Sequence, residues 1–300
     1  MTTCVVDAAD APPITLRVLG ISVTFHTSSA AVRRLAGECF HSLGAAMEPA
    51  SAGTLELTVR IMVCDGNEHG IFPVPVRHIS MDGGMLLVHT PGSTALVHPA
   101  HRSSTAYVSR ELLAHEDTFR TAVLEAITYA LIAPFDRHPV HASAIVRNGC
   151  AVLLAGPSGS GKSTLAHRAD AAGVDVLSED HVWIQCEPAL RVWGGAEAAR
   201  LMLDDADDEK QTVPITHRAV WAERARVCVL ARGEHALLEP LDPAAIIREL
   251  EAQVAPGFDR FPERQQQVFA AIAASGGWRL TLSSRPADAL PFLFEMLEST

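Results

Sequence analysis

The sequence lacks the cysteine and histidine patterns that identify several common classes of protein. Its six cysteines form no CxxC pair, and its 14 histidines show neither zinc-type spacing nor an HExxH motif. Regularly spaced cysteines mark disulfide-stapled secreted domains, and clustered cysteine and histidine residues mark zinc sites. The scattered cysteines are therefore predicted to be buried, reduced thiols.

The sequence also has no run rich in Lys and Arg, and its net charge at pH 7 is −11. A chain with this charge repels nucleic acid, so no nucleic-acid partner is expected. A bound polyphosphate needs only a local positive pocket, so the acidic total does not argue against a nucleotide site.

Long hydrophobic runs are missing as well. No stretch reaches the roughly 18 uninterrupted apolar residues of a membrane span, and the opening MTTCVVDAADAPP has no basic segment followed by a long apolar one. Neither a membrane partner nor a secretory signal is expected. A cytoplasmic location is predicted.

The chain has 300 residues, of which 48% are hydrophobic and 20% charged. This length fits one large or two ordinary domains with ample core. We place a domain boundary within 112–138 and predict two domains, 1–112 and 113–300. The boundary is given as a range because no Gly/Ser linker marks it. The sequence does not decide whether the chain forms a homo-oligomer.

The pattern of the N-terminal part, 1–112, predicts an α+β domain. Within the boundary region, a helix over 116–131 is indicated by apolar residues at every fourth position, and Pro134 ends it. The remaining predicted segments are strands within 14–27, a helix from Ser28 or Ser29 to about Met47, a strand over 54–64, a long connection over 65–82, and short strands within 83–109.

The second part predicts a mixed α/β domain. Two apolar runs, 140–147 and 150–155, are joined by Asn148-Gly149, which favours a type I′ hairpin because both of its central residues need a positive φ. A helix that Gly173 caps comes next. The later predicted segments are strands over 174–177, 181–185, 226–231 and 278–282, and helices near 243–254, 261–274 and from 286.

The segment GPSGSGKS at 156–163 matches the P-loop (Walker A) pattern GxxxxGK[ST] at every required position, between an apolar strand and a helix. Glycines let backbone N–H groups wrap around phosphate, and the helix adds its positive N-terminal end. The bland alternative is a Gly/Ser-rich turn before a helix. The predicted nucleotide-binding residues are Gly156, Pro157, Ser158, Gly159, Ser160, Gly161, Lys162, Ser163 and Thr164, with Lys162 on the phosphates and Ser163 on Mg²⁺.

Two acidic residues, Glu179 and Asp180, end the next predicted strand. A phosphotransferase needs one carboxylate for Mg²⁺ and one group to accept the acceptor's proton. Adjacent strand residues point to opposite faces, so the two are expected to take different roles. An ordinary solvated strand end is the alternative. His141 opens the strand expected to pair with the P-loop strand and is a candidate proton relay, although a lone histidine is usually structural.

The stretch HASAIVRNGCAVLLAGPSGSGKSTLAHRADAAGVDVLSEDHVWI resembles the catalytic core of the HPr kinase/phosphorylase family over residues 140–185. The resemblance implies a P-loop kinase core related to phosphoenolpyruvate carboxykinase rather than the common doubly wound fold. It also implies ATP- and Mg²⁺-dependent phosphorylation of a serine hydroxyl.

Residue by residue, the resemblance implies that His141 is the active-site histidine, Glu179 the general base, and Asp180 the second, metal-binding carboxylate. Position 179 is Glu where the family usually has Asp, and the family's downstream signature segment is not found. The chain is more similar to shorter HPr-kinase-like proteins, some of which phosphorylate ribosomal-peptide precursors, lasso peptides among them. Those relatives carry a later basic residue, for which Arg200 and Lys210 are candidates.

Three functions follow from these observations. The first is a serine kinase acting on a peptide or small protein, and the second is a small-molecule kinase on the same core. The third is a non-catalytic, nucleotide-gated binding or regulatory module. Fold constrains function weakly, so the three are separated by the acceptor and by whether a phosphorylated product forms.

Overall fold

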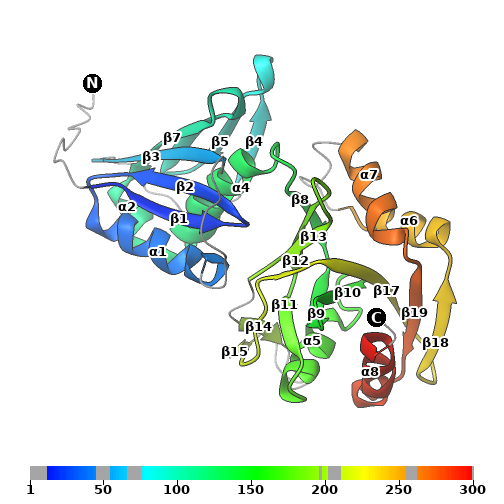
Figure 1. The fold of residues 1–300 in the computed structure, drawn as a ribbon. Helices are drawn as coiled ribbons and strands as arrows, with labels where there is room; N and C mark the ends of the chain where they lie inside the picture. The colour runs from blue at the N-terminus through cyan, green and yellow to red at the C-terminus, as the bar shows by residue number, and fades with distance from the viewer. Residues whose placement is uncertain are drawn as a thin grey trace. The chain divides into compact units, whose positions relative to one another are not determined.

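The computed structural model describes residues 12–44, 55–65, 76–195, 198–201, 211–254 and 262–298. Contacts divide the chain into two compact units, Met1–Phe135 and Asp136–Thr300, each of which is described by itself (Figure 1). Among the described residues, no helix combines the length and the apolar character needed to cross a bilayer.

The first unit is built on a seven-stranded sheet in the order β1-β2-β3-β7-β6-β5-β4. The pairs β2–β3 and β3–β7 are parallel, and the other neighbours are antiparallel. Its strands are β1 (Ile14–Val18), β2 (Ile21–His26), β3 (Glu56–Cys64), β4 (Arg77–Ser80), β5 (Leu86–Thr90), β6 (Ser93–His98) and β7 (Ser103–Ser109).

Helices pack against this sheet through an aromatic cluster. Phe40 of α1 stacks on Phe25 of β2 with ring centroids 5.8 Å apart and meets Tyr129 of α4 edge-on at 6.2 Å. The hydroxyl of Ser29 caps α1 by accepting a 3.3 Å hydrogen bond from the amide of Val32. The helical segments are α1 (Ala30–Gly44), η1 (Asp82–Gly84), η2 (Pro99–His101), α2 (Arg110–Ala114), α3 (Glu116–Phe119), the π-helical η3 (Arg120–Glu125) and α4 (Ala126–Ile132).

Most of the predicted segments of this unit are confirmed. The helix predicted over 116–131 is α3–η3–α4, and its every-fourth-residue positions are all buried: Phe119, Val123, Ile127 and Leu131. The predicted connection over 65–82 is wrong in one part, because β4 occupies 77–80. All four residues of β4 are exposed, so this edge strand carries no apolar alternation in its sequence. Met47, Thr54 and residues 66–75 lie outside the described residues.

The second unit is built on a six-stranded sheet in the order β11-β9-β10-β17-β19-β18. The P-loop strand β10 pairs antiparallel with β9 and parallel with β17, so the unit is a mixed α/β structure and not an all-parallel doubly wound sheet. The strands are β11 (Asp175–Ser178), β9 (Ser143–Arg147), β10 (Cys150–Ala155), β17 (Arg224–Arg232), β19 (Gly277–Leu282) and β18 (Leu237–Leu241).

Both faces of this sheet are covered, which is why β10 is a continuous apolar run. Leu153 faces a core shared with α6, α7 and a four-stranded sheet, whereas Val152 and Leu154 face a core shared with α5 and α8. These helices are labelled in Figure 1. The helical segments are α5 (Lys162–Ala171), α6 (Pro243–Glu251), α7 (Pro262–Ala273), η4 (Pro286–Ala289) and α8 (Leu290–Glu298).

The four-stranded sheet has the order β16-β13-β12-β8, and β14 pairs with β15. The predicted helices of this unit and the strand β12 are confirmed. The pairings of β13, β14, β15, β16 and β18 were not anticipated, because these segments are short or polar. Their bounds are β8 (His138–His141), β12 (His181–Gln185), β13 (Arg191–Trp193), β14 (Ala198–Leu201), β15 (Gln211–Pro214) and β16 (Trp221–Ala222).

The strand predicted over 140–147 is wrong in one respect, because the chain changes sheet at Ala142. The segment before it, β8, pairs with β12, and the segment after it, β9, pairs with β10. The predicted hairpin between β9 and β10 is confirmed, with φ of 51° at Asn148 and 73° at Gly149.

Candidate functional site

Four connections converge at one edge of the six-stranded sheet. Strands β10, β17 and β19 are parallel, and β11 runs in the same direction because both β11 and β10 are antiparallel to β9. Their carboxyl ends therefore carry the P-loop, the turn with Glu179 and Asp180, Arg232 and Ser283 to the same edge. Open α/β sheets bind their ligands at this edge.

The backbone of the P-loop favours glycine at position 161. Its φ is 108°, a conformation that L side chains rarely adopt, and an added Cβ would lie 3.0 Å from Leu282 Cδ1. Gly161 is followed at once by α5, as predicted, so the positive end of the helix dipole lies at the loop.

Polar groups line the inside of this loop. The ammonium of Lys162 is buried, with the residue only 6% exposed, and donates to the carbonyl oxygens of Gly156 at 2.7 Å and Pro157 at 3.2 Å. The Ser160 hydroxyl is buried, points at Gly156, and has no hydrogen-bond partner among the described residues. An unpaired buried hydroxyl costs roughly 1–3 kcal/mol, which a bound anion can recover.

The acidic pair lies in the two-residue connection between β11 and β12, rather than on a strand as the sequence suggested. Asp180 is held by an imidazole on each oxygen: His141 Nε2 lies 3.0 Å from Oδ1, and His181 Nδ1 lies 3.0 Å from Oδ2. The hydrogen bonds from His141 and His181 hold the pKa of the Asp180 carboxyl far below its usual range, against the opposing effect of burial.

The same connection is fixed to the P-loop side of the sheet through its backbone. The Ser143 hydroxyl donates to the carbonyl oxygen of Glu179, and Ser143 pairs across the hairpin with Leu154, two residues before the loop. The Ser178 hydroxyl accepts from the amide of His181 at 3.1 Å. Hydrogen bonds from β9 and β12 therefore hold the backbone at Glu179 in place, and the side chain of Glu179 is half-buried.

His141 reaches this site by a different route from the one predicted. It is the last residue of β8 and pairs with His181 of β12, so it does not open the strand beside β10. Its imidazole contacts Asp180 and therefore acts on that carboxylate. Arg200 lies in β14, where only its backbone is described, and Lys210 lies outside the described residues.

Two residues at this edge were not anticipated. His181 directly follows the acidic pair, and that adjacency is the signal that could have identified it. Arg232 ends β17 and donates from Nη2 to the carbonyl oxygen of Gly159 in the P-loop at 3.2 Å. Its place follows only from the β10–β17 pairing, which joins segments about 75 residues apart.

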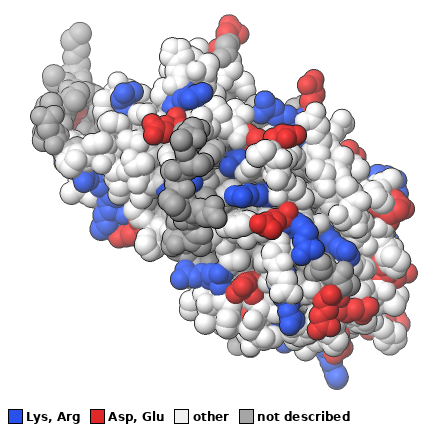
Figure 2. Space-filling view, in the orientation of Figure 1, with Lys and Arg blue, Asp and Glu red and all other residues white. Residues whose placement is uncertain are grey.

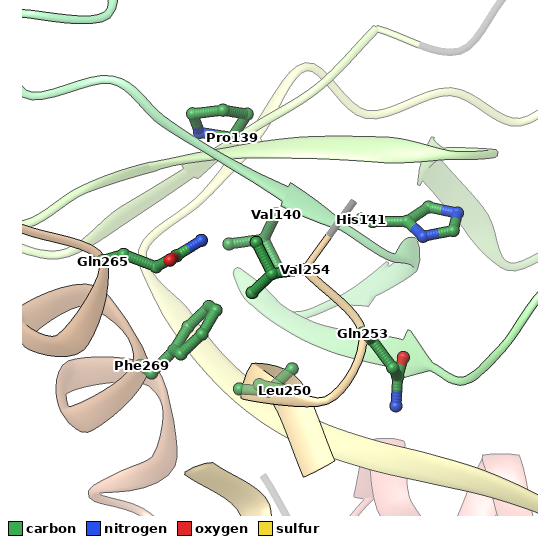
Figure 3. Close-up of a pocket in the computed structure, with 8 residues that line it drawn as sticks. All are labelled: Pro139, Val140, His141, Leu250, Gln253, Val254, Gln265 and Phe269. Carbon is green, nitrogen blue, oxygen red and sulfur yellow. The ribbon is translucent and has the colours of Figure 1, made fainter. Parts of the chain in front are cut away.

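A small, mostly apolar pocket lies beside this site (Figure 3). His141 is one of the lining residues, and its imidazole projects away from the other lining side chains. It is lined by β8, the end of α6 and α7, through Pro139, Val140, His141, Leu250, Gln253, Val254, Gln265 and Phe269.

The oxygen groups at this edge would suit magnesium rather than zinc. The Ser163 hydroxyl and the Asp180 carboxylate are hard donors, and a carboxylate oxygen that accepts from an imidazole keeps a second lone pair. Within the described ranges, no group of three or more His, Cys, Asp and Glu could hold a metal by itself. A magnesium ion that is also bound to phosphate needs only one or two protein ligands.

Charges of both signs are interspersed on the face of the molecule that Figure 2 displays. No protein-family model matches the chain, and no curated protein matches it. Among the solved structures that match is the Hpr(Ser) kinase/phosphatase from Coxiella burnetii, at 14% identity and a TM-score of 0.32, over 54% of this chain and 88% of that one. A likeness this weak carries no argument, so the function rests on the geometry of the site.

Proposed function

We propose that the protein is an ATP- and Mg²⁺-dependent phosphotransferase that phosphorylates a serine hydroxyl of a peptide or small protein. One observation supports this above the others: the P-loop and the acidic connection emerge at the same edge of one sheet. A phosphate cradle and two carboxylates are the parts that phosphoryl transfer needs from a protein.

The P-loop supplies binding and charge. Its amides and the start of α5 address the phosphates, and the Lys162 ammonium exchanges its two carbonyl partners for phosphate oxygens. Ser163 and Asp180 would hold Mg²⁺, which neutralises charge on the phosphates when bound.

The electrostatics of Asp180 support different roles for the two carboxylates. A carboxylate whose pKa lies far below its usual range is a weak proton acceptor, which suits Asp180 to the metal rather than to base catalysis. Glu179 then accepts the proton of the serine hydroxyl. The hydroxyl oxygen forms a bond to the γ-phosphorus, the bond from that phosphorus to the β,γ-bridging oxygen breaks, and ADP leaves with the bond's electron pair.

The acceptor we propose is the precursor of a ribosomally made peptide, of the lasso type. This choice rests on the resemblance of residues 140–185 to short HPr-kinase-like proteins. The unit Met1–Phe135 is proposed to dock the peptide.

The test is transfer of labelled phosphate from ATP to a co-encoded peptide, compared with a panel of free amino acids. Glu179→Gln should lower the rate by about 10²–10⁴-fold and leave ATP affinity nearly unchanged, since only proton transfer is lost. Lys162→Ala should weaken ATP binding itself. Glu187→Gln, an exposed residue just beyond the far end of β12, is the matched control and should behave as wild type.

Each alternative has its own outcome in this assay. Labelling of an amino acid instead of the peptide would identify a small-molecule kinase. Peptide binding that depends on Mg²⁺-ATP without any labelled product would identify a nucleotide-gated module. Full activity of Glu179→Gln would contradict the assignment of the base.

A further inference from the structure

A cation outside the P-loop motif lies against the loop. Arg232 is the last residue of β17, and its Nη2 donates to the Gly159 carbonyl oxygen at 3.2 Å. The parallel register sets Ala155, the last residue of β10, opposite Val229. Arg232 is therefore three residues beyond that pair, alongside the first residues of the loop.

The packing of the loop shows how close this guanidinium comes. An ideal Cβ on Gly161 would lie 3.5 Å from Arg232 Nη2 and 3.9 Å from its Cζ. Arg232 thus borders the turn from which α5 begins. On the inner side of the loop, the buried Ser160 hydroxyl points at Gly156 without a partner among the described residues, which is a second mark of a ligand site.

The chemistry of arginine suits this place. A guanidinium carries five N–H donors in a planar fork that matches phosphate oxygens, and the bond to Gly159 is made by Nη2 alone. Lys162 is buried inside the loop, whereas Arg232 is exposed beside it, so the two cations can address the same polyphosphate from different sides.

We propose that Arg232 is a second phosphate-binding cation of this site and contacts the β- or γ-phosphate of the nucleotide. The inference rests on the proposed nucleotide binding and is independent of which molecule accepts the phosphate.

The same strand supplies a matched control. Arg224 begins β17, is exposed, and donates from Nη2 to the carbonyl oxygen of Asn148, also at 3.2 Å. It makes the same kind of contact with a loop at the opposite edge of the sheet. If Arg232 only holds a loop in place, the two arginines should be equivalent in a nucleotide-binding experiment.

The experiment is calorimetric titration of the full chain with AMP, ADP and ATP, each with Mg²⁺. Arg232→Gln should lower the affinity for ATP by about tenfold, equivalent to ~1.4 kcal/mol, and leave that for AMP unchanged. A loss with both ADP and ATP assigns the contact to the β-phosphate, and a loss with ATP alone assigns it to the γ-phosphate. Arg224→Gln should match wild type, and Arg232→Lys should recover part of the affinity because it keeps the charge.

The outcomes separate this inference from the proposed function. Equal affinities of Arg232→Gln and Arg224→Gln for ATP, while Lys162→Ala loses binding, would overturn the role of Arg232 alone. Normal ATP affinity without transfer to any acceptor would overturn the kinase proposal and leave the Arg232 result readable. A wild-type chain that binds no nucleotide overturns both.

Discussion

Asp180 lies between two imidazoles, and this arrangement has a measurable consequence for the pH dependence of the site. Hydrogen bonds from His141 and His181 lower its pKa, so the carboxylate stays ionised well into acid. Removing one donor should let the pKa rise toward its ordinary value near 3.9. The ionised form of Asp180, which we propose binds Mg²⁺, would then be lost at a higher pH than in wild type.

We therefore expect His141→Ala to move the acidic limb of the rate–pH profile upward. His141→Gln is the matched variant, because the glutamine amide can take the place of the Nε2 donor that contacts Asp180. The acidic limb of His141→Gln should lie closer to that of wild type than the limb of His141→Ala does. Profiles of kcat for the three proteins test this, and identical acidic limbs would show that His141 does not tune Asp180.

The residues of the site differ in how far the sequence predicts them. The P-loop is predictable because its eight residues are contiguous, and the four positions that the pattern fixes are set by contact between the loop and phosphate. Arg232 was missed because its role depends on two strands distant in sequence. The place of His141 in the chain was anticipated, but its contact was not, since the break between β8 and β9 at Ala142 leaves no mark in an apolar run.

At the scale of elements, Gly194, which directly follows β13, approaches β11 so closely that a side chain does not fit there. A Cβ on Gly194 would lie 2.3 Å from the Leu177 carbonyl oxygen, and the Gly194 amide also donates to Val220 at 3.0 Å. Leu177 is two residues before Glu179. The contact therefore contributes to the position of the acidic connection.

Gly194→Ala should destabilise the protein by ~3 kcal/mol, because the backbone of β11 must move to admit a methyl group. Gly37→Ala in α1 is the control: its Cβ would meet only Ile14 Cδ1 at 4.0 Å, and alanine favours helix. Chemical denaturation should show a loss for the first and an unchanged or slightly raised stability for the second. If Gly194→Ala were as stable as wild type, the backbone around Gly194 and Leu177 would have to shift at little cost.

Element boundaries were predicted best where one periodicity governs a segment. The helix over 116–131 and the hairpin at Asn148-Gly149 follow from local rules and are confirmed. The exposed strand β4 and the two-residue strand β16 were missed because pairing with a neighbour, not their own side chains, makes them strands.

At the scale of the whole molecule, acid stability should depend on one buried carboxylate. Burial opposes ionisation of Asp170, but the backbone amides of His217 and Thr216 donate to it and lower its pKa. A group with a lowered folded pKa stabilises the protein fully above its unfolded pKa, about 3.9, and this contribution is lost as pH falls through the folded pKa.

Asp170→Asn should therefore lower stability at pH 7 by about 1–3 kcal/mol, since a buried charge-assisted set of bonds becomes a neutral one. The gap from wild type should shrink as the pH falls below about 4. Urea denaturation at pH 7, 5 and 3 measures this difference in the free energy of unfolding. A difference that stays constant over this range would mean that ionisation of Asp170 does not stabilise the fold.

The mixed α/β class follows from the order of predicted segments, but the strand order of the six-stranded sheet does not. The antiparallel neighbour of β10 is predictable from the hairpin turn, whereas the parallel partner β17 is brought in across 68 residues between Ala155 and Arg224. Long-range pairing of this kind is decided by packing of the whole core, which no local window contains.

The change of sheet at Ala142 should make the proposed phosphoryl transfer sensitive to substitutions at positions that contact no substrate. His141, just before Ala142, contacts the Asp180 carboxylate, and Ser143, just after it, donates to the Glu179 carbonyl oxygen. The two residues belong to different sheets. A random mutagenesis screen for inactive but folded variants should therefore recover substitutions in the apolar layer between those sheets, such as at Val182 or Ala144, alongside changes in the motif itself.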